Sequence, residues 1–154
     1  MIEFCYPDKS NIDRVKSLYL KHRDSLGIPF ERVFDAMLDN KNFVVAMDGE
    51  LVIGLCGIHF RKRYGFYEVE HLCVDSAYRN QHIAIRMLQI LFSKAISQNR
   101  RLFCYPVFCA YAIDGMENNK FYDRLCTNYH LVKRKNIVLR RYYFDVEGVM
   151  KYGS

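Results

Sequence analysis

The sequence predicts an α+β fold, with a mixed sheet of about six or seven strands and about four helices in one domain over residues 1–154. Three observations lead to this prediction. The 154-residue length is that of one domain. Apolar residues recur with helical spacing in some segments and alternate, or run continuously, in others. Strands and helices do not alternate strictly along the chain, which implies both parallel and antiparallel strand pairs.

The first 60 residues contain signals for strands, helices and one hairpin. We expect a strand over residues 2–6, a helix from 10 or 11 to about 26, a short helix over 30–38, and strands over 43–47 and 51–60. Pro7 ends the first strand, and Gly27 and Pro29 end the first helix. Asp48-Gly49 between two β-rich runs predicts a hairpin turn.

The rest of the chain contains the longest predicted helix. We expect a strand over residues 66–74, a helix over about 83–98, a strand over 102–109, a helix over 116–125, and strands over 129–132 and 137–144. One face of the long helix is apolar and consists of Ala84, Leu88, Leu91, Ala95 and Ile96. The run over 102–109 is continuously apolar, which is typical of a buried strand.

The net charge of +6 and the pI of about 9.0 favour anionic partners. A phosphorylated cofactor, a nucleic acid and an acidic protein all fit this charge. We expect the basic clusters at 61–63, 99–101, 133–135 and 140–141 to be solvated surface. Six cysteines without a CxxC pair argue against zinc ribbons and thioredoxin-type sites. The sequence shows no signal peptide and no apolar run of membrane-spanning length, so we expect a cytoplasmic protein.

The segment over residues 68–84 is the most informative for function. A predicted strand ends at Val74, a turn contains Asp75 and Arg79, and a helix begins near Ile83. A loop that leads into a helix N-terminus presents unpaired backbone N–H groups and the positive end of the helix dipole. This segment is therefore a candidate anion site that could hold a diphosphate.

Two short motifs carry a family resemblance. The first is Leu72-Cys73-Val74-Asp75, followed by Tyr78-Arg79 and the run to Ala84, and the second is Phe121-Tyr122-Asp123-Arg124-Leu125. With the order of elements, they resemble the GNAT superfamily of acyl-coenzyme A-dependent N-acyltransferases. The chain departs from the family pattern at His82, where glycine is usual, and at Gly115, where asparagine is usual.

The resemblance implies a mostly antiparallel sheet and a cofactor site for acetyl-coenzyme A. The backbone of the loop and first helical turn would hold the diphosphate through Arg79, Asn80, Gln81, His82, Ile83 and Ala84. Cys73 and Val74 would pair with the pantetheine arm as an added strand does. The fourth and fifth strands would diverge so that donor and amine enter from opposite sides. Histidine is enriched at positive φ, so the turn at His82 can form, although loss of the site is the open alternative.

The amine must lose a proton before it attacks, and this step needs a carboxylate. Glu68 and Glu70 are two residues apart on one strand and share a face of the sheet, so their repulsion would raise one pKa toward neutrality. We favour Glu70 as the base, with Glu68 as the alternative, and Tyr122 as the general acid. Two further interpretations remain open: both glutamates are solvent-exposed, and Tyr122 is a packed core aromatic.

The leading function is transfer of an acetyl group to a primary amine of a small molecule, a protein lysine or an N-terminus. One alternative is a GNAT-fold binding module without activity. The other is an acetyltransferase that acts on aminoacyl-tRNA, which the absence of a dense basic stripe disfavours. We expect structural roles for His71 and His130, and for His59, which could otherwise line the acceptor cleft. The aromatic end Tyr142-Tyr143-Phe144 could pair in a homodimer.

Overall fold

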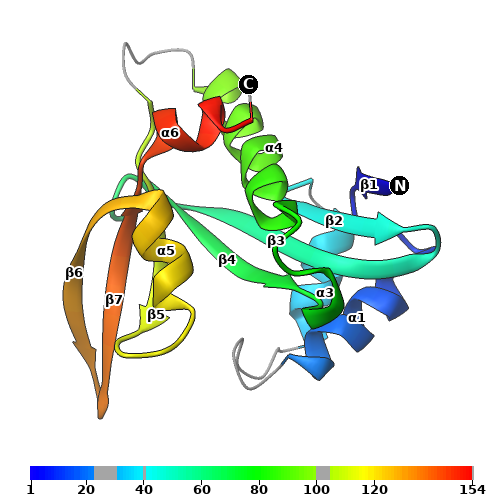
Figure 1. Ribbon diagram of the computed structural model, residues 1–154, viewed down its shortest axis with the longest axis horizontal. Helices are drawn as coiled ribbons and strands as arrows, with labels where there is room; N and C mark the ends of the chain where they lie inside the picture. Colours follow the sequence, from blue (N-terminus) through cyan, green and yellow to red (C-terminus); the bar gives the residue numbers. More distant parts are fainter. Residues whose placement is uncertain (23–30, 40, 100–104, 154) are drawn as a thin grey trace. The chain divides into compact units, whose positions relative to one another are not determined.

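The fold is described from a computed structural model, which describes residues 1–22, 31–39, 41–99 and 105–153 (Figure 1). The strands are β1 (Ile2–Cys5), β2 (Phe43–Asp48), β3 (Leu51–Arg61), β4 (Phe66–Val74), β5 (Phe108–Ile113), β6 (Cys126–Arg134) and β7 (Ile137–Phe144). The helices are α1 (Ile12–Lys21), α3 (Glu31–Asp39), α4 (Ile83–Gln98), α5 (Asn119–Leu125) and α6 (Val146–Lys151), with a 3₁₀ turn η1 (Ser76–Tyr78).

All seven strands belong to one mixed sheet in the order β1-β2-β3-β4-β5-β7-β6. The pairs β1–β2, β2–β3, β5–β7 and β6–β7 are antiparallel, and β4 pairs with β5 in parallel. This mixed pairing confirms the predicted α+β class. The β4–β5 register covers Tyr67–Val69 and Phe108–Ala110, and both strands continue beyond it.

Most of the predicted elements are confirmed to within one residue. They include the strands expected at 2–6, 43–47, 51–60, 66–74 and 137–144 and the helix expected at 83–98. The first helix is confirmed to Lys21, and its expected last residues lie outside the described part of the chain.

The strand expected after the long helix is confirmed as β5, but its expected bounds of 102–109 are wrong. Residues 102–104 lie outside the described part, and β5 begins at Phe108 and runs to Ile113. The reason lies in the start of the strand pairing. Pro106 has no N–H to donate, and the first bond of this pair runs from the Tyr67 N–H to the Val107 carbonyl over 2.9 Å.

The helix expected from residue 116 begins three residues later, and a C-terminal helix was not expected. The buried Asn119 side chain accepts hydrogen bonds from the N–H groups of Gly115 and Met116, so these residues form a turn before α5. Helix α6 follows Asp145, whose side chain accepts a hydrogen bond from the Gly148 N–H. The described residues therefore contain five α-helices rather than about four.

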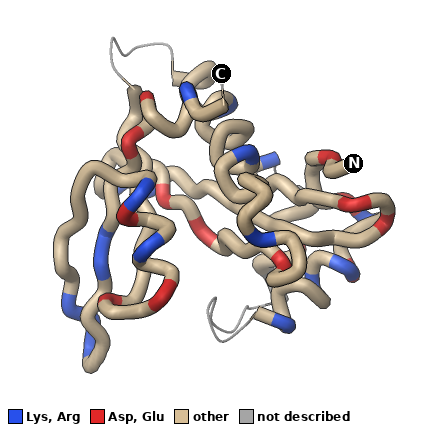
Figure 2. Tube along the Cα trace, viewed as in Figure 1, with Lys and Arg blue, Asp and Glu red and all other residues tan. Residues whose placement is uncertain are grey.

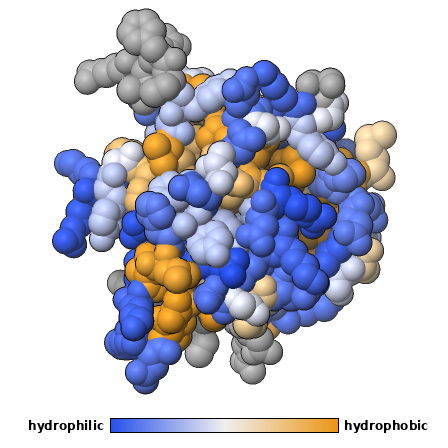
Figure 3. All heavy atoms as spheres, turned by 60° about the vertical axis from the view of Figure 1, so that its left-hand side comes forward, coloured by the Kyte–Doolittle hydropathy of each residue, from blue (hydrophilic) through white to orange (hydrophobic). Residues whose placement is uncertain are grey.

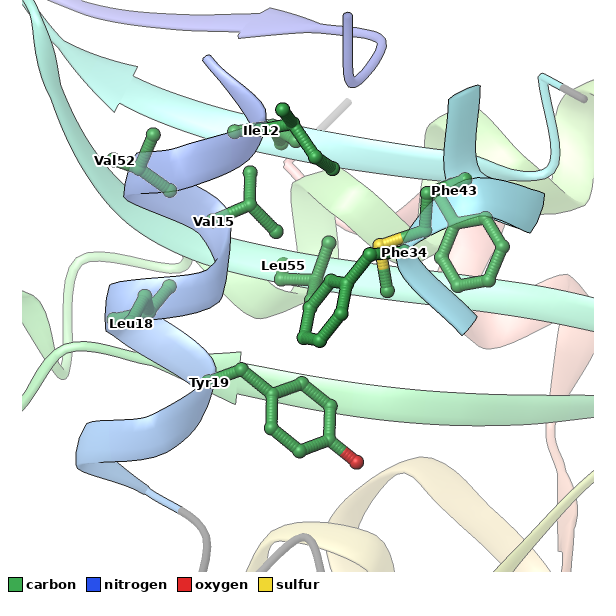
Figure 4. Close-up of a cluster of buried hydrophobic side chains, with 10 residues drawn as sticks. Ile12, Val15, Leu18, Tyr19, Phe34, Phe43, Val52 and Leu55 are labelled. Carbon is green, nitrogen blue, oxygen red and sulfur yellow. The ribbon is translucent and has the colours of Figure 1, made fainter. Parts of the chain in front are cut away.

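The first of two compact units consists of residues Met1–Ile58 and His71–Leu91. Its apolar core joins α1 and α3 to the strands (Figure 4). The buried members of this core are Ile12, Val15, Leu18, Tyr19, Phe34, Met37, Phe43, Val45, Val52 and Leu55. The first part of α4 contacts the same strands through Met87. A Cβ on Gly54 would stand 3.1 Å from Met87 Cε and 3.2 Å from Ala46 Cβ, so glycine permits this close packing.

The second unit consists of His59–Glu70 and Phe92–Ser154. Phe92 stacks on Phe108 with ring centroids 3.9 Å apart and meets Phe144 edge-on at 5.4 Å. Apolar residues such as Leu131 and Ile137 stay exposed on the β6–β7 hairpin. Figure 3, which brings this side forward, shows areas of apolar surface among hydrophilic ones.

The single-domain organisation over residues 1–154 stays a prediction. Of the helices in the described ranges, none has the length and apolar character needed to cross a membrane.

Candidate functional site

The turn after β4 is held in place by hydrogen bonds to neighbouring elements. The Asp75 N–H donates to the Ile53 carbonyl over 2.7 Å. The Asp75 carboxylate accepts from the Ala77 N–H over 3.2 Å and pairs with Lys21 Nζ at 3.1 Å. These two groups, the Ala77 N–H first, lower the pKa of Asp75. The family-motif aspartate thus shapes the turn.

The motif residues Tyr78 and Arg79 also anchor this turn. Tyr78 Oη donates a hydrogen bond to Asp48 Oδ2 over 2.7 Å, which ties the turn to the end of β2. Arg79 Nε donates to the Val74 carbonyl over 3.4 Å. These two hydrogen bonds fix the position of the first residues of the loop that leads from Arg79 to α4.

The loop from Arg79 to His82 contains two residues with positive φ. Asn80 has φ +66° and His82 has φ +60°, both in the left-handed region. This result confirms that histidine can replace glycine in the turn. The His82 carbonyl accepts from the Arg86 N–H over 3.1 Å, so the helix begins directly after the loop.

The loop and the start of α4 fit an anionic group. Residues 79–82 are exposed, so their backbone is accessible. The first turn of α4 contains no acidic side chain; Arg79 precedes the helix, and Arg86 is its fourth residue. The exposed loop, the helix N-terminus and the positive side chains together suit a diphosphate.

Within β4, His71 has a left-handed conformation with φ +56°. Its Nδ1 lies 3.0 Å from Tyr19 Oη, and its ring stacks on Phe43. Tyr19 belongs to the core of the first unit, and Figure 4 shows its hydroxyl pointing away from the other labelled side chains. The structural role expected for His71 is confirmed.

Cys73 and Val74 are partly buried at the end of β4. Burial raises the pKa of the Cys73 thiol to about 12, so this thiol stays protonated at neutral pH. Cys73 is therefore no candidate nucleophile, and its predicted role concerns the backbone alone.

The two glutamates of β4 share Arg61 as a partner. Arg61 Nε lies 2.9 Å from Glu68 Oε1, and Arg61 Nη2 lies 4.0 Å from Glu70 Oε2. The glutamate side chains are only 18% and 22% exposed, which disagrees with the interpretation that both are solvent-facing. Sequence reasoning placed Arg61 in a solvated cluster and missed this pairing. The signal available was its position across a predicted turn from Glu68.

The two carboxylates differ in their electrostatics. Burial first, and then the negative charge of Glu68, raise the pKa of Glu70 to about 7, and Arg61 opposes both effects. Repulsion between the two glutamates, the cause expected from the sequence, is thus the smaller one, since desolvation comes first. A carboxyl group with a pKa near neutrality is suited to general-base work.

Tyr122 lies in the core of the second unit. It is 9% exposed, and its ring stacks on Tyr142 with centroids 5.2 Å apart. This packing agrees with the interpretation that Tyr122 is a core aromatic residue. The role of its hydroxyl as general acid stays a prediction. His59 and His130 are exposed, and His130 Nδ1 lies 3.5 Å from Tyr143 Oη.

Solved structures share this fold at low sequence identity. An N-acetyltransferase from Staphylococcus aureus Mu50 gives a TM-score of 0.71 at 15% identity, with 95% of this chain and 99% of that chain covered. A diaminobutyrate acetyltransferase from Paenibacillus lautus, in complex with L-2,4-diaminobutyric acid and coenzyme A, gives 0.68 at 14% identity, with 93% and 95% covered.

A third similar structure is a longer protein. It is the N-acetylglutamate synthase from Neisseria gonorrhoeae complexed with coenzyme A and N-acetyl-glutamate, with a TM-score of 0.70 at 9% identity. The match covers 94% of this chain and 35% of that chain, so this chain spans about a third of that protein's length.

A search of the curated proteins found no match. The family model of the acetyltransferase (GNAT) domain matches residues 39–125, which is more than half of the sequence. This chain belongs to the GNAT acetyltransferase family.

Proposed function

We propose that this protein transfers an acetyl group from acetyl-coenzyme A to a primary amine. The observation that carries the proposal is the Glu70 carboxyl, whose pKa is about 7, on the strand that leads into the left-handed loop. The fold shared with acetyltransferases that were solved with coenzyme A supports the same reaction class.

The residues of the loop fit the donor. The backbone of Arg79 to Ala84 would hold the diphosphate, because its N–H groups lie at the start of α4 and His82 keeps the left-handed form. Cys73 and Val74 would bind the pantetheine arm through backbone hydrogen bonds. When bound, acetyl-coenzyme A supplies a thioester, which is an activated acyl group.

The residues of the chain would move the protons of the reaction. An amine is mostly protonated at neutral pH and becomes a nucleophile when it loses a proton. Glu70 would accept this proton, since a carboxyl group with a pKa of about 7 can both bind and release a proton near neutral pH. Tyr122 would donate the proton of its phenol hydroxyl to the leaving thiolate.

Thermal unfolding with acetyl-coenzyme A tests donor binding. A ligand that binds only the folded state stabilises it by about 2.7 kcal/mol at a hundredfold excess over its Kd. We expect a rise in Tm that grows with ligand concentration, and retained coenzyme A in native mass spectrometry. The absence of any shift at millimolar ligand would contradict the proposal.

A further inference from the structure

One face of the second unit carries charged side chains from several neighbouring strands. Paired residues of adjacent strands share a face, and so do residues two apart on one strand. Glu68 pairs with Cys109, and Tyr111, two residues further along β5, pairs with Arg141. Glu68, Glu70, Tyr111 and Arg141 therefore lie on the same face. Figure 2 shows the acidic positions on β4 and the basic positions on β7.

Aromatic side chains surround the Arg141 guanidinium on this face. Its Nε donates a hydrogen bond to Tyr111 Oη over 2.9 Å. Its central carbon lies 5.4 Å from the Tyr111 ring centre and 5.7 Å from those of Tyr64 and Phe66. Hydrogen bonding by Tyr143, and secondarily by Tyr111, raises the pKa of Arg141. The rings hold the guanidinium in one orientation, so less conformational freedom is lost when it binds a ligand.

Arg141 differs from two other arginines of the second unit in its partners. Arg61 pairs with Glu68 and Glu70, and Arg140 pairs with Asp114 at 2.5 Å. Within the described ranges, the contacts of Arg141 are phenol groups and aromatic rings, and no carboxylate forms an ion pair with it. A planar guanidinium fork with no carboxylate partner is suited to bind one from a ligand.

The charges on this face favour a ligand with a single negative charge. With both glutamates (Glu68 and Glu70) ionised, the three arginines on this face (Arg61, Arg134 and Arg141) leave one positive charge in excess. A carboxylate, with one negative charge, balances this excess. A phosphate dianion would leave a net negative charge and would be repelled by the nearby glutamates. β4 and β7 are two strand spacings apart, or about 10 Å, which side chains from both strands can bridge to one small molecule.

We propose that Arg141 binds a carboxylate of the acceptor, so that the acceptor is a small amine that also carries a carboxylate, as an amino acid does. This inference rests on the proposed function, because it places the amine of the same molecule toward Glu70. Arg141 is then a specificity-determining residue of the acceptor site.

Matched acceptors test this inference. We would measure kcat/KM for free L-amino acids and for the corresponding carboxamides, which keep the amine and lose the negative charge. A hydrogen-bonded pair with a charged group corresponds to a preference of about 10- to 100-fold for the carboxylate form. In Arg141→Gln this preference should disappear through a rise in KM for the carboxylate form, while Arg141→Lys should keep part of it.

Arg140→Gln is the matched control, because Arg140 is the adjacent residue on the opposite face. It should leave the ratio of the two acceptors unchanged. Equal rates for both acceptors in the wild type would overturn the inference, and so would an equal loss for both in Arg141→Gln with folding retained. A preference for phosphorylated amines or acidic peptides over free amino acids would also overturn it. Binding of acetyl-coenzyme A without acetylation of any amine would instead refute the proposed function.

Discussion

Glu70→Gln separates the proposed catalytic role of this carboxyl group from its effect on stability. The pKa of Glu70 is raised to about 7, chiefly by burial. If Glu70 removes the amine proton, kcat/KM of the wild type should rise tenfold per pH unit below pH 7 and level off above it. Glutamine keeps the shape and cannot accept the proton. We expect the variant to lose about 10²–10⁴-fold at pH 7.

The pH dependence of this loss follows from the same mechanism. Without the base only the free amine reacts, so the variant rate should keep rising from pH 6 to 9. The difference from the wild type should therefore shrink by about tenfold per pH unit above 7. The assay is steady-state release of coenzyme A thiol at several pH values, with acetyl-coenzyme A affinity measured in parallel as the control.

The stability of the same variant should change in the opposite direction. A pKa raised from 4.5 to about 7 means that the folded protein binds this proton more tightly than the unfolded chain does. The stabilisation by the protonated form is complete below pH 4.5 and is lost as the pH rises through 7. Glu70→Gln should thus be more stable than the wild type at pH 8, by at most about 3 kcal/mol, and equal to it at pH 4.

Glu68→Gln is the matched control on the same strand face. It removes the negative charge of Glu68, which raises the pKa of Glu70. Arg61 then has Glu70 as its remaining ion-pair partner of the two, which also lowers the pKa of Glu70. The inflection near pH 7 should therefore move to lower pH while activity at pH 8 remains. A larger loss in Glu68→Gln than in Glu70→Gln would make Glu68 the base. An unchanged pH profile in both variants would refute a catalytic role for either carboxylate.

Three further substitutions test other parts of the account. His82→Gly should keep or raise the affinity for acetyl-coenzyme A in calorimetry at pH 9, since φ is +60° here; a large loss would show an essential imidazole contact. Gly57→Ala should lower stability in urea by about 1–3 kcal/mol, because its Cβ would overlap the Phe43 ring; an unchanged midpoint would contradict this packing. Tyr122→Phe keeps the ring stacked on Tyr142 and should lower turnover by about 10²-fold with little change in Tm; unchanged turnover would leave Tyr122 a packing role only.

The segment from β4 to α4 could be predicted from the sequence because its signals are local. The apolar run that ends at Val74 and the 3.6-residue spacing after Ile83 determine both ends of the loop. The left-handed form at His82 was also predictable, since histidine tolerates positive φ.

The partner of Arg141 could not be predicted from local signals, and the partner of Arg61 could be found only from the predicted turn that follows it. Arg61 reaches Glu68 only through the turn between β3 and β4, and Arg141 reaches Tyr111 only through the register of β5 and β7. A basic cluster in the sequence is usually solvated surface. Lys62 and Arg63 are exposed as expected. Arg61, Arg140 and Arg141 are only partly exposed, because strand pairing brings acidic and aromatic side chains to them.

The start of β5 and the presence of α6 also could not be predicted from the pattern of apolar residues. An apolar run predicts burial, yet Pro106 and the first bond at Val107 decide where the strand begins. The six residues of α6 are too short for a periodic pattern to be recognised. The Asp145 cap was the local signal available for this helix.

Product analysis tests most directly whether this protein acetylates a primary amine, as we propose. The purified protein would be incubated with acetyl-coenzyme A and a panel of amines, amino acids and peptides, and the products identified by mass spectrometry. We predict one added acetyl group on the amine nitrogen of an acceptor, with an equal amount of free coenzyme A, and about 10²–10⁴-fold less product from Glu70→Gln at pH 7. Bound acetyl-coenzyme A that persists with no acetylated amine in the panel would contradict the claim and favour a binding module.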